Sequence, residues 1–145
     1  METALDQIAD LLALEKRERL SLKVMADLEP YLRMSLPSKA INRVRQACGV
    51  TIDDFAPIFG TSRRNLFVLL KRNNVDAYIS DRLYRVVSVI VRAINVFGSR
   101  KKASEWMKMP LQSLGGDTPI SKLDNEIGAT RVLEVLGAIE HGVYA

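Results

Sequence analysis

Apolar residues return every three or four positions along almost the whole chain, and alternating β-branched runs are rare. This spacing places apolar side chains on one face of a helix. The longest regular stripe lies in the segment 79–98 and ends at Gly98, a residue type that commonly stops helices. The sequence therefore predicts an all-α fold built around a helix over about 80–97. The apolar residues of that helix are Leu83, Val86, Val87, Ile90, Val91, Ile94 and Phe97. These seven residues form more apolar surface than one chain of this size is expected to cover, which predicts a dimer.

Start and stop signals predict further helices before this element. Thr3 has the position of an N-cap, while Ser38 and Gly49 have those of the cap and the stop of another helix. The region between about 19 and 36 is ambiguous, and its apolar residues indicate a second short helix that ends near Pro30.

Similar signals follow the long helix. Ser99 is the predicted cap of a short helix that ends before Pro110 and turns Trp106 inward. Thr118 and Pro119 are predicted as an N-cap and a first helical residue, and Gly142 as the stop of the last helix. The inward residues of that last helix are Val132, Val135, Leu136 and Ile139.

The segment 51–72 has the spacing of a helix-turn-helix. Ala56 stands four residues before Gly60, where a small side chain lets two helices approach, and Gly60 permits the sharp turn. Ser62 is the predicted N-cap of the second helix. A plain helical hairpin inside a bundle is the alternative. In both cases Leu66 and Leu69 are expected to pack against Phe55 and Phe59.

Charge favours the DNA-binding alternative. The chain of 145 residues has a net charge of +4, but positions 39–108 hold fourteen Lys/Arg against five Asp/Glu, or +9. Positions 1–38 contribute −2 (five against seven) and positions 109–145 contribute −3 (two against five). A basic middle is typical of a region that contacts a polyanion. The predicted DNA-binding residues are Ser62, Arg63, Arg64, Asn65, Lys71 and Arg72.

Two apolar residues lie beside these basic side chains. Phe67 and Val68 share the outward side of the predicted second helix. They either contact a thymine methyl group or belong to the core, and the sequence leaves both open.

The C-terminal third resembles the antitoxin family named for Xre, MbcA and ParS. The matching stretches are "FGSRKKASEWMKMP" and "LGGDTPISKLDNEIGATRVLEVLGAIEHGVYA", and the resemblance extends over about 50–145. It implies a homodimer that binds operator DNA through a helix-turn-helix and neutralises a toxin with an Arg-Glu-Ser (RES) domain. Such toxins resemble ADP-ribosyltransferases and act on NAD, by degrading it or by transferring from it. The stretch "RRNLFVLLK" is more apolar than the arginine-rich recognition helices of that family.

The resemblance also gives a role to the end of the chain. It implies that the C-terminal domain packs on the toxin and that the extreme C-terminus approaches or plugs the toxin's active site. A docked tail that fills the protein's own core is the alternative, and His141 is as well suited to cap the last helix as to contact a toxin. The predicted toxin-binding residues are Glu140, His141, Gly142, Val143, Tyr144 and Ala145.

The remaining expectations concern chemistry and organisation. One histidine, one cysteine and scattered carboxylates favour no catalysis, no metal and no cofactor. Without a signal peptide or a bilayer-spanning stretch, a cytoplasmic protein is expected. A stand-alone transcription regulator and a protein-binding helical adaptor remain alternatives to the antitoxin. Three regions are predicted: an N-terminal segment of unclear role at 1–38, a helix-turn-helix region with a dimerisation helix at 39–98, and a toxin-binding domain at 99–145.

Overall fold

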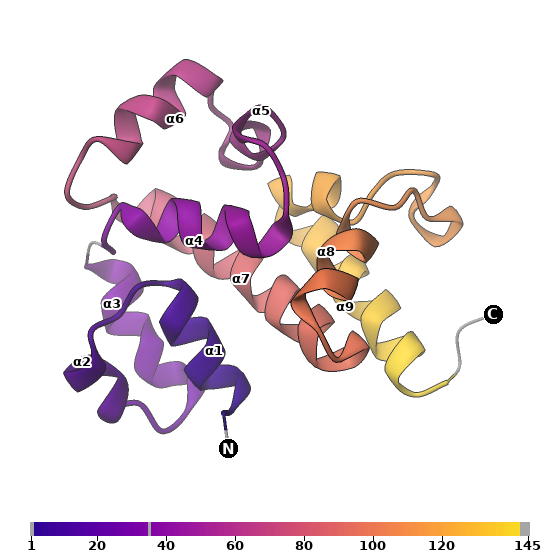
Figure 1. Cartoon of the computed structure of the whole chain (residues 1–145), viewed down its shortest axis with the longest axis horizontal. Helices are drawn as coiled ribbons and strands as arrows, with labels where there is room; N and C mark the ends of the chain where they lie inside the picture. The colour runs from indigo at the N-terminus through magenta and orange to yellow at the C-terminus, as the bar shows by residue number, and fades with distance from the viewer. Residues whose placement is uncertain (1, 35, 143–145) are drawn as a thin grey trace.

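A computed structural model describes residues 2–34 and 36–142. Over these residues the regular elements are α-helices and 3-10 helices, so the predicted all-α fold is confirmed. The long helix α7, Ala77–Phe97, crosses the centre of the molecule (Figure 1). The helices α1, α3, α4, α8 and α9 all pack against α7. Helices from the N-terminal and the C-terminal parts of the chain therefore pack against the same central helix.

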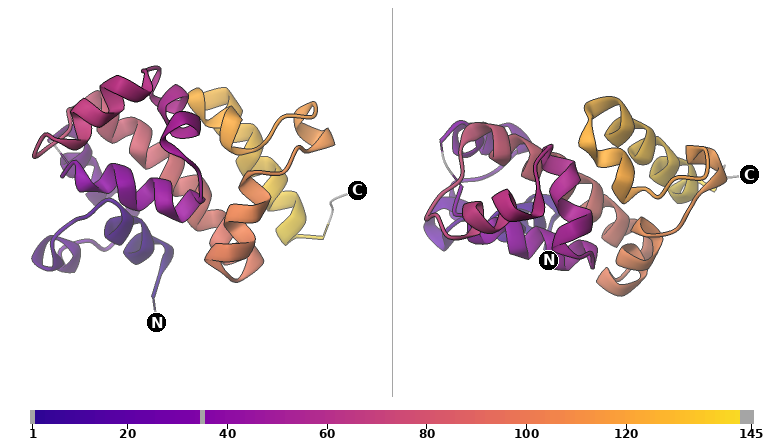
Figure 2. Two further views of the ribbon diagram at one scale, coloured as in Figure 1. Left: turned by 45° about the horizontal axis from the view of Figure 1, so that its top comes forward. Right: turned by 90° about the horizontal axis from the view of Figure 1, so that it is seen from above.

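The other elements are arranged in three groups around α7. The N-terminal helices gather on one side of α7, α5 and α6 lie beyond α4, and α8 and α9 lie toward the other end (Figures 1 and 2). Their bounds are α1 Ala4–Leu11, α2 Lys16–Leu20, η1 Met25–Leu28, α3 Glu29–Arg33, α4 Lys39–Cys48, α5 Ile52–Phe55, η2 Ala56–Phe59, α6 Arg63–Leu70, α8 Arg100–Met107, η3 Gln112–Leu114, η4 Ile120–Asp124 and α9 Glu126–Glu140.

Asp76 and Gly98 set the two ends of α7. The Asp76 carboxylate accepts a hydrogen bond from the Ile79 backbone N–H at 2.9 Å, which caps the start. Gly98 ends the helix with φ 87°, a conformation that costs glycine little. The buried side chains of α7 include Val89 and Ala93 as well as five of the predicted stripe: Leu83, Val86, Val87, Ile90 and Val91.

This burial removes one argument for a dimer. The predicted stripe was expected to expose more apolar surface than one chain covers, whereas most of it is buried within a single chain. That expectation was wrong because the N-terminal helices, α4, α8 and α9 cover α7 from several sides. A homodimer therefore needs another surface.

Two N-terminal signals were placed incorrectly. Pro30 does not end a helix: it lies in the first turn of α3, where its missing N–H costs nothing. Ser38 precedes α4 as predicted, but its side chain makes no cap. The Ser38 hydroxyl instead donates to the Arg72 carbonyl oxygen, which ties the start of α4 to the segment after α6. Thr3 does cap α1, in a reciprocal arrangement with Asp6.

The last helix begins later than Thr118. Pro119 and Thr118 open the short 3-10 helix η4, and α9 has its own N-cap in Asn125, which accepts from the Gly128 N–H at 2.8 Å. The turn between these elements is tight: a Cβ at Gly128 would lie 2.0 Å from the Lys122 carbonyl oxygen. Only glycine fits there without movement of the backbone.

Across residues 2–34 and 36–142, no helix combines the length and the hydropathy that a bilayer span requires.

Candidate functional site

The segment predicted as a helix-turn-helix forms a helix, a tight turn and a second helix. The first helix is capped by Thr51 and continues from α5 into η2. Gly60 then takes φ 62°, which reverses the chain direction. The Ser62 hydroxyl accepts a hydrogen bond from the Asn65 N–H at 3.1 Å and caps α6. The local geometry therefore follows the sequence signals, while the DNA-binding role stays a prediction.

Aromatic side chains of the first helix and leucines of the second are buried at this junction. The rings of Phe55 and Phe59 meet edge to face, with centroids 5.1 Å apart. Both rings are buried with Leu66, and Leu69 is 7% exposed. The inner side of α6 is thus committed to the core, and its opposite side remains open to solvent.

The open side of α6 combines cations with apolar groups. Positions 63, 64, 67, 68 and 71 follow a helical spacing that places them on one face. Arg63 is held by an ion pair to Asp53, with Nε 3.4 Å from the carboxylate, and its guanidinium lies 5.5 Å from the centre of the Phe67 ring. Phe67 is 41% exposed and Val68 is 45% exposed. We call this surface, made of Arg63, Arg64, Phe67, Val68 and Lys71, the α6 face.

The remaining predicted DNA-binding residues lie beside the α6 face. The Asn65 side-chain amide donates to the Thr61 hydroxyl at 2.7 Å, which uses one of its two N–H groups. Arg72 follows the helix, and its carbonyl oxygen accepts the Ser38 hydroxyl hydrogen bond. Lys39, the first residue of α4, is exposed next to this junction. Basic side chains therefore continue from α6 toward the start of α4.

The predicted toxin-binding end lies at the C-terminal end of α9. Glu140 forms an ion pair with Arg92 of α7 at 2.8 Å, which fixes the last turn to the central helix. The His141 side chain is 73% exposed, and Gly142 takes φ 70°. The other predicted residues of this site, Val143, Tyr144 and Ala145, lie outside the described residues.

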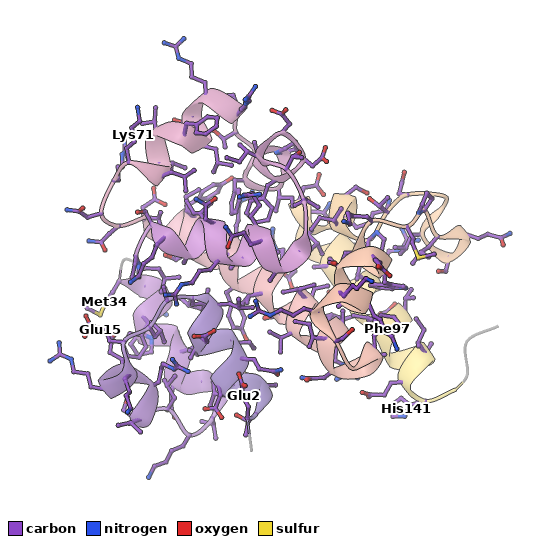
Figure 3. All side chains as sticks on the ribbon, in the orientation of Figure 1. Glu2, Glu15, Met34, Lys71, Phe97 and His141 are labelled. Carbon is purple, nitrogen blue, oxygen red and sulfur yellow. The ribbon has the colours of Figure 1, made fainter. Side chains whose placement is uncertain are left out.

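The two candidate sites lie far apart. Figure 3 labels Lys71 at the end of α6 and His141 at the end of α9, at opposite ends of the molecule's long axis. The two views of Figure 2 show the same separation of α6 and α9.

Sequence reasoning missed two apolar side chains of α9 that the structure exposes. Ile127 is 76% exposed and Leu133 is 38% exposed. Leu133 also lines two neighbouring cavities of about 400 and 380 Å³, which share Tyr84, Ser88 and Leu133. The helical spacing already places Ile127 and Leu133 outside the predicted inward stripe of α9, and this spacing could have indicated their exposure.

Two nucleophilic side chains, Cys48 and Ser121, lie in surroundings that do not activate them. Burial raises the pKa of Cys48 to about 12, so its thiol stays protonated and unreactive near neutral pH. A cavity of about 480 Å³ between η2 and η4 is lined by Ser121, Asp124 and Lys108 among others. The Ser121 hydroxyl donates to the Thr118 carbonyl oxygen at 2.7 Å and has no histidine among the residues that line the cavity. Over 2–34 and 36–142, no three His, Cys, Asp or Glu residues cluster as metal ligands would.

The C-terminal part of the chain is similar to a known protein family. Residues 92–142 match the model of the antitoxin Xre/MbcA/ParS C-terminal toxin-binding domain. This match confirms the family resemblance predicted from the sequence. It covers α8, η3, η4, α9 and the end of α7.

Relatives named Antitoxin Xre support the same placement. The protein from Photorhabdus laumondii is 46% identical over 65 residues, which is 44% of this chain and 44% of the relative. That from Yersinia enterocolitica is 42% identical over 67 residues, or 46% and 45%. That from Pseudomonas putida is 38% identical over 63 residues, or 43% and 40%. The chain thus matches less than half the length of each relative.

Proposed function

Because residues 92–142 match the model of the antitoxin Xre/MbcA/ParS C-terminal toxin-binding domain, we propose that the chain is the antitoxin of a type II toxin–antitoxin system. It binds and neutralises a RES-domain toxin that acts on NAD, and it represses its own operon. The observation that carries the proposal is the match to a toxin-binding domain, together with relatives named Antitoxin Xre. We place this function in the cytoplasm, with no cofactor.

Neutralisation is assigned to the end of α9 and the residues after it. The Arg92–Glu140 ion pair links the last turn of α9 to the central helix, next to the proposed tail. The exposed Ile127 and Leu133 provide apolar area on the same helix for a protein partner. In this proposal the domain surface binds the toxin and the tail occludes its active site.

Co-purification tests the partnership. The chain is co-expressed with the product of the neighbouring gene, and the mixture is purified through a tag on that product. Co-elution at constant ratio is expected. Elution of the tagged protein alone would contradict the proposed pairing.

DNA binding is assigned to the α6 face and the basic residues beside it. The segment 62–72 carries Arg63, Arg64, Lys71 and Arg72 without an acidic residue. The Ser62 cap leaves the start of α6 open toward solvent, where free backbone N–H groups favour a phosphate. Since this face is remote from α9, we propose that DNA and toxin bind at the same time (Figure 3).

Loss of one cation from the α6 face is expected to weaken DNA binding. Replacing Arg63, Arg64 or Lys71 with alanine removes a phosphate contact, so the slope of log affinity against log salt should fall by about one for each. Fluorescence anisotropy with promoter DNA over a series of salt concentrations measures this. The matched control is Arg17→Ala, because Arg17 is 87% exposed on α2 in the N-terminal segment. A triple variant that binds as tightly as the parent would refute the placement.

We also propose a homodimer, because an operator reader gains affinity from two half-sites. Light scattering at micromolar concentration should give twice the chain mass of 16.2 kDa. A monomer mass throughout this range would remove the dimer from the account. Toxin and DNA binding would then be functions of the single chain.

The alternative function is a stand-alone transcription regulator. The basic α6 face favours it independently of the C-terminal domain. A reading frame for a RES-domain protein beside the gene favours the antitoxin, and salt-dependent binding to promoter DNA separates both regulators from a protein-only adaptor.

A further inference from the structure

Phe67 and Val68 are exposed at the centre of a basic surface. They occupy adjacent outward positions on α6, with Arg63, Arg64 and Lys71 on the same face. The inner side of the helix is already filled by Leu66 and Leu69. The alternative that Phe67 and Val68 belong to the core is therefore wrong, and these apolar groups need another explanation.

The Phe67 ring lies beside a cation of the same helix. The Arg63 guanidinium lies 5.5 Å from the ring centre, and the same guanidinium pairs with Asp53 of α5. The ring is thus flanked by a cation that is itself anchored to the preceding helix. Val68 has a β-branched side chain, which is restricted to few rotamers in a helix. Both apolar groups therefore meet a ligand with little loss of side-chain freedom.

The charge around these residues selects the kind of partner. Apolar side chains flanked by the cations Arg63, Arg64 and Lys71 fit a polyanion that carries small apolar groups between its charges. In the major groove of DNA, the apolar group on the edge of a standard base is the C5-methyl group of thymine, and phenylalanine is among the side chains that contact it. A protein partner would instead need an apolar surface surrounded by carboxylates.

We propose that Phe67 and Val68 recognise thymine by contact with its C5-methyl group, while Arg63, Arg64 and Lys71 hold the flanking phosphates. This inference rests on the proposed DNA binding and adds a base preference to it. Sequence selection then comes from methyl contacts on the α6 face, in addition to any hydrogen bond from Asn65. Thymines are expected where the first turns of α6 enter the groove.

Duplexes that differ only in the methyl group test the inference. Duplexes of about 30 base pairs tile the DNA upstream of the gene and are prepared with thymine or with uracil, which lacks the C5-methyl group. Affinity for the bound duplex should fall about fourfold for each contacted methyl group removed, the factor that corresponds to one buried methylene-sized group. This comparison needs no change in the protein, so it is independent of folding.

Protein variants then assign the effect to the two residues. Phe67→Ala and Val68→Ala should bind thymine and uracil duplexes with a smaller difference than the parent, as expected for coupled groups. Lys71→Ala is the matched control on the same face, and it should lower affinity while keeping the parent's thymine-to-uracil ratio. Circular dichroism of each variant checks that it keeps the helical content of the parent.

Each outcome separates this inference from the proposed function. If the parent binds thymine and uracil duplexes equally, methyl recognition is overturned and DNA binding stands. If both alanine variants keep the full thymine preference, the assignment to Phe67 and Val68 is overturned. If no duplex binds even at low salt, the proposed DNA binding falls and the inference with it. If the variants lose toxin binding but not thymine preference, the α6 face binds protein and the inference is overturned.

Discussion

Alanine at Gly128 is expected to lower the free energy of unfolding by about 2 to 4 kcal/mol, because the added methyl group has no space. Its Cβ would lie 2.0 Å from the Lys122 carbonyl oxygen, a backbone atom that moves only with η4. The displacement would also strain the Asn125 cap, since the Gly128 N–H donates to that side chain. Urea unfolding followed by circular dichroism measures the change.

Gly137 provides a matched control on the same helix. A Cβ at Gly137 meets no atom within 4 Å. Gly137→Ala should therefore raise the free energy of unfolding by about 0.5 to 1 kcal/mol, because alanine loses less backbone entropy in a helix. Equal stability of the Gly128→Ala variant and the parent would show that the junction between η4 and α9 is looser than the structure indicates.

A chain that ends at His141 is expected to stay folded and to lose neutralisation. Among the described residues, the last buried side chain of α9 is Leu136, and the half-buried Ile139 also precedes the deletion. The deletion of residues 142–145 removes one described backbone bond, from the Gly142 N–H to the Ile139 carbonyl oxygen. Toxin activity should return almost fully, because the segment proposed to occlude its active site is absent.

The deletion distinguishes the two roles predicted for the tail. Thermal unfolding and growth of cells that express the toxin are measured together. A folded, truncated chain that still protects cells would contradict occlusion by the tail. A truncated chain that loses several kcal/mol of stability, as removal of buried side chains does, would place the tail in the protein's own core. A control with Glu2→Ala, an exposed residue that precedes the Thr3 cap, should keep both properties.

Local signals predicted much of the fold. Gly49, Gly60 and Gly98 each take a positive φ where the sequence placed a stop or turn. Thr3, Ser62 and Ser99 each cap a helix through the side chain. These features depend on a few neighbouring residues, and for that reason one sequence is enough to find them.

Features that depend on distant contacts were not predictable in the same way. Ser38 precedes a helix, but its hydroxyl bonds to Arg72, 34 positions away, in place of its own helix. The apolar stripe of α7 was interpreted as an uncovered surface because its covering helices come from both ends of the chain. The exposure of Phe67, Ile127 and Leu133 likewise became apparent only from packing.

The two candidate sites also differ in how far the sequence alone could predict them. The basic residues of the α6 face were visible in the sequence as cations with no acidic residue between them, and the structure adds their exposure and the position of Phe67. The toxin-binding end was predicted from the family resemblance alone. Three of its residues lie outside the described part of the chain, so the structure does not test their role. The anchoring of Glu140 by Arg92 joins residues 48 positions apart, and no local pattern indicates it.

Growth rescue tests the central claim most directly. The toxin encoded beside the gene is induced in cells with or without this chain, and growth and cellular NAD are measured in parallel. The account predicts growth arrest and altered NAD with the toxin alone, and restoration of both when the chain is present. Arrest that continues despite soluble, folded chain in excess over the toxin would contradict an antitoxin function.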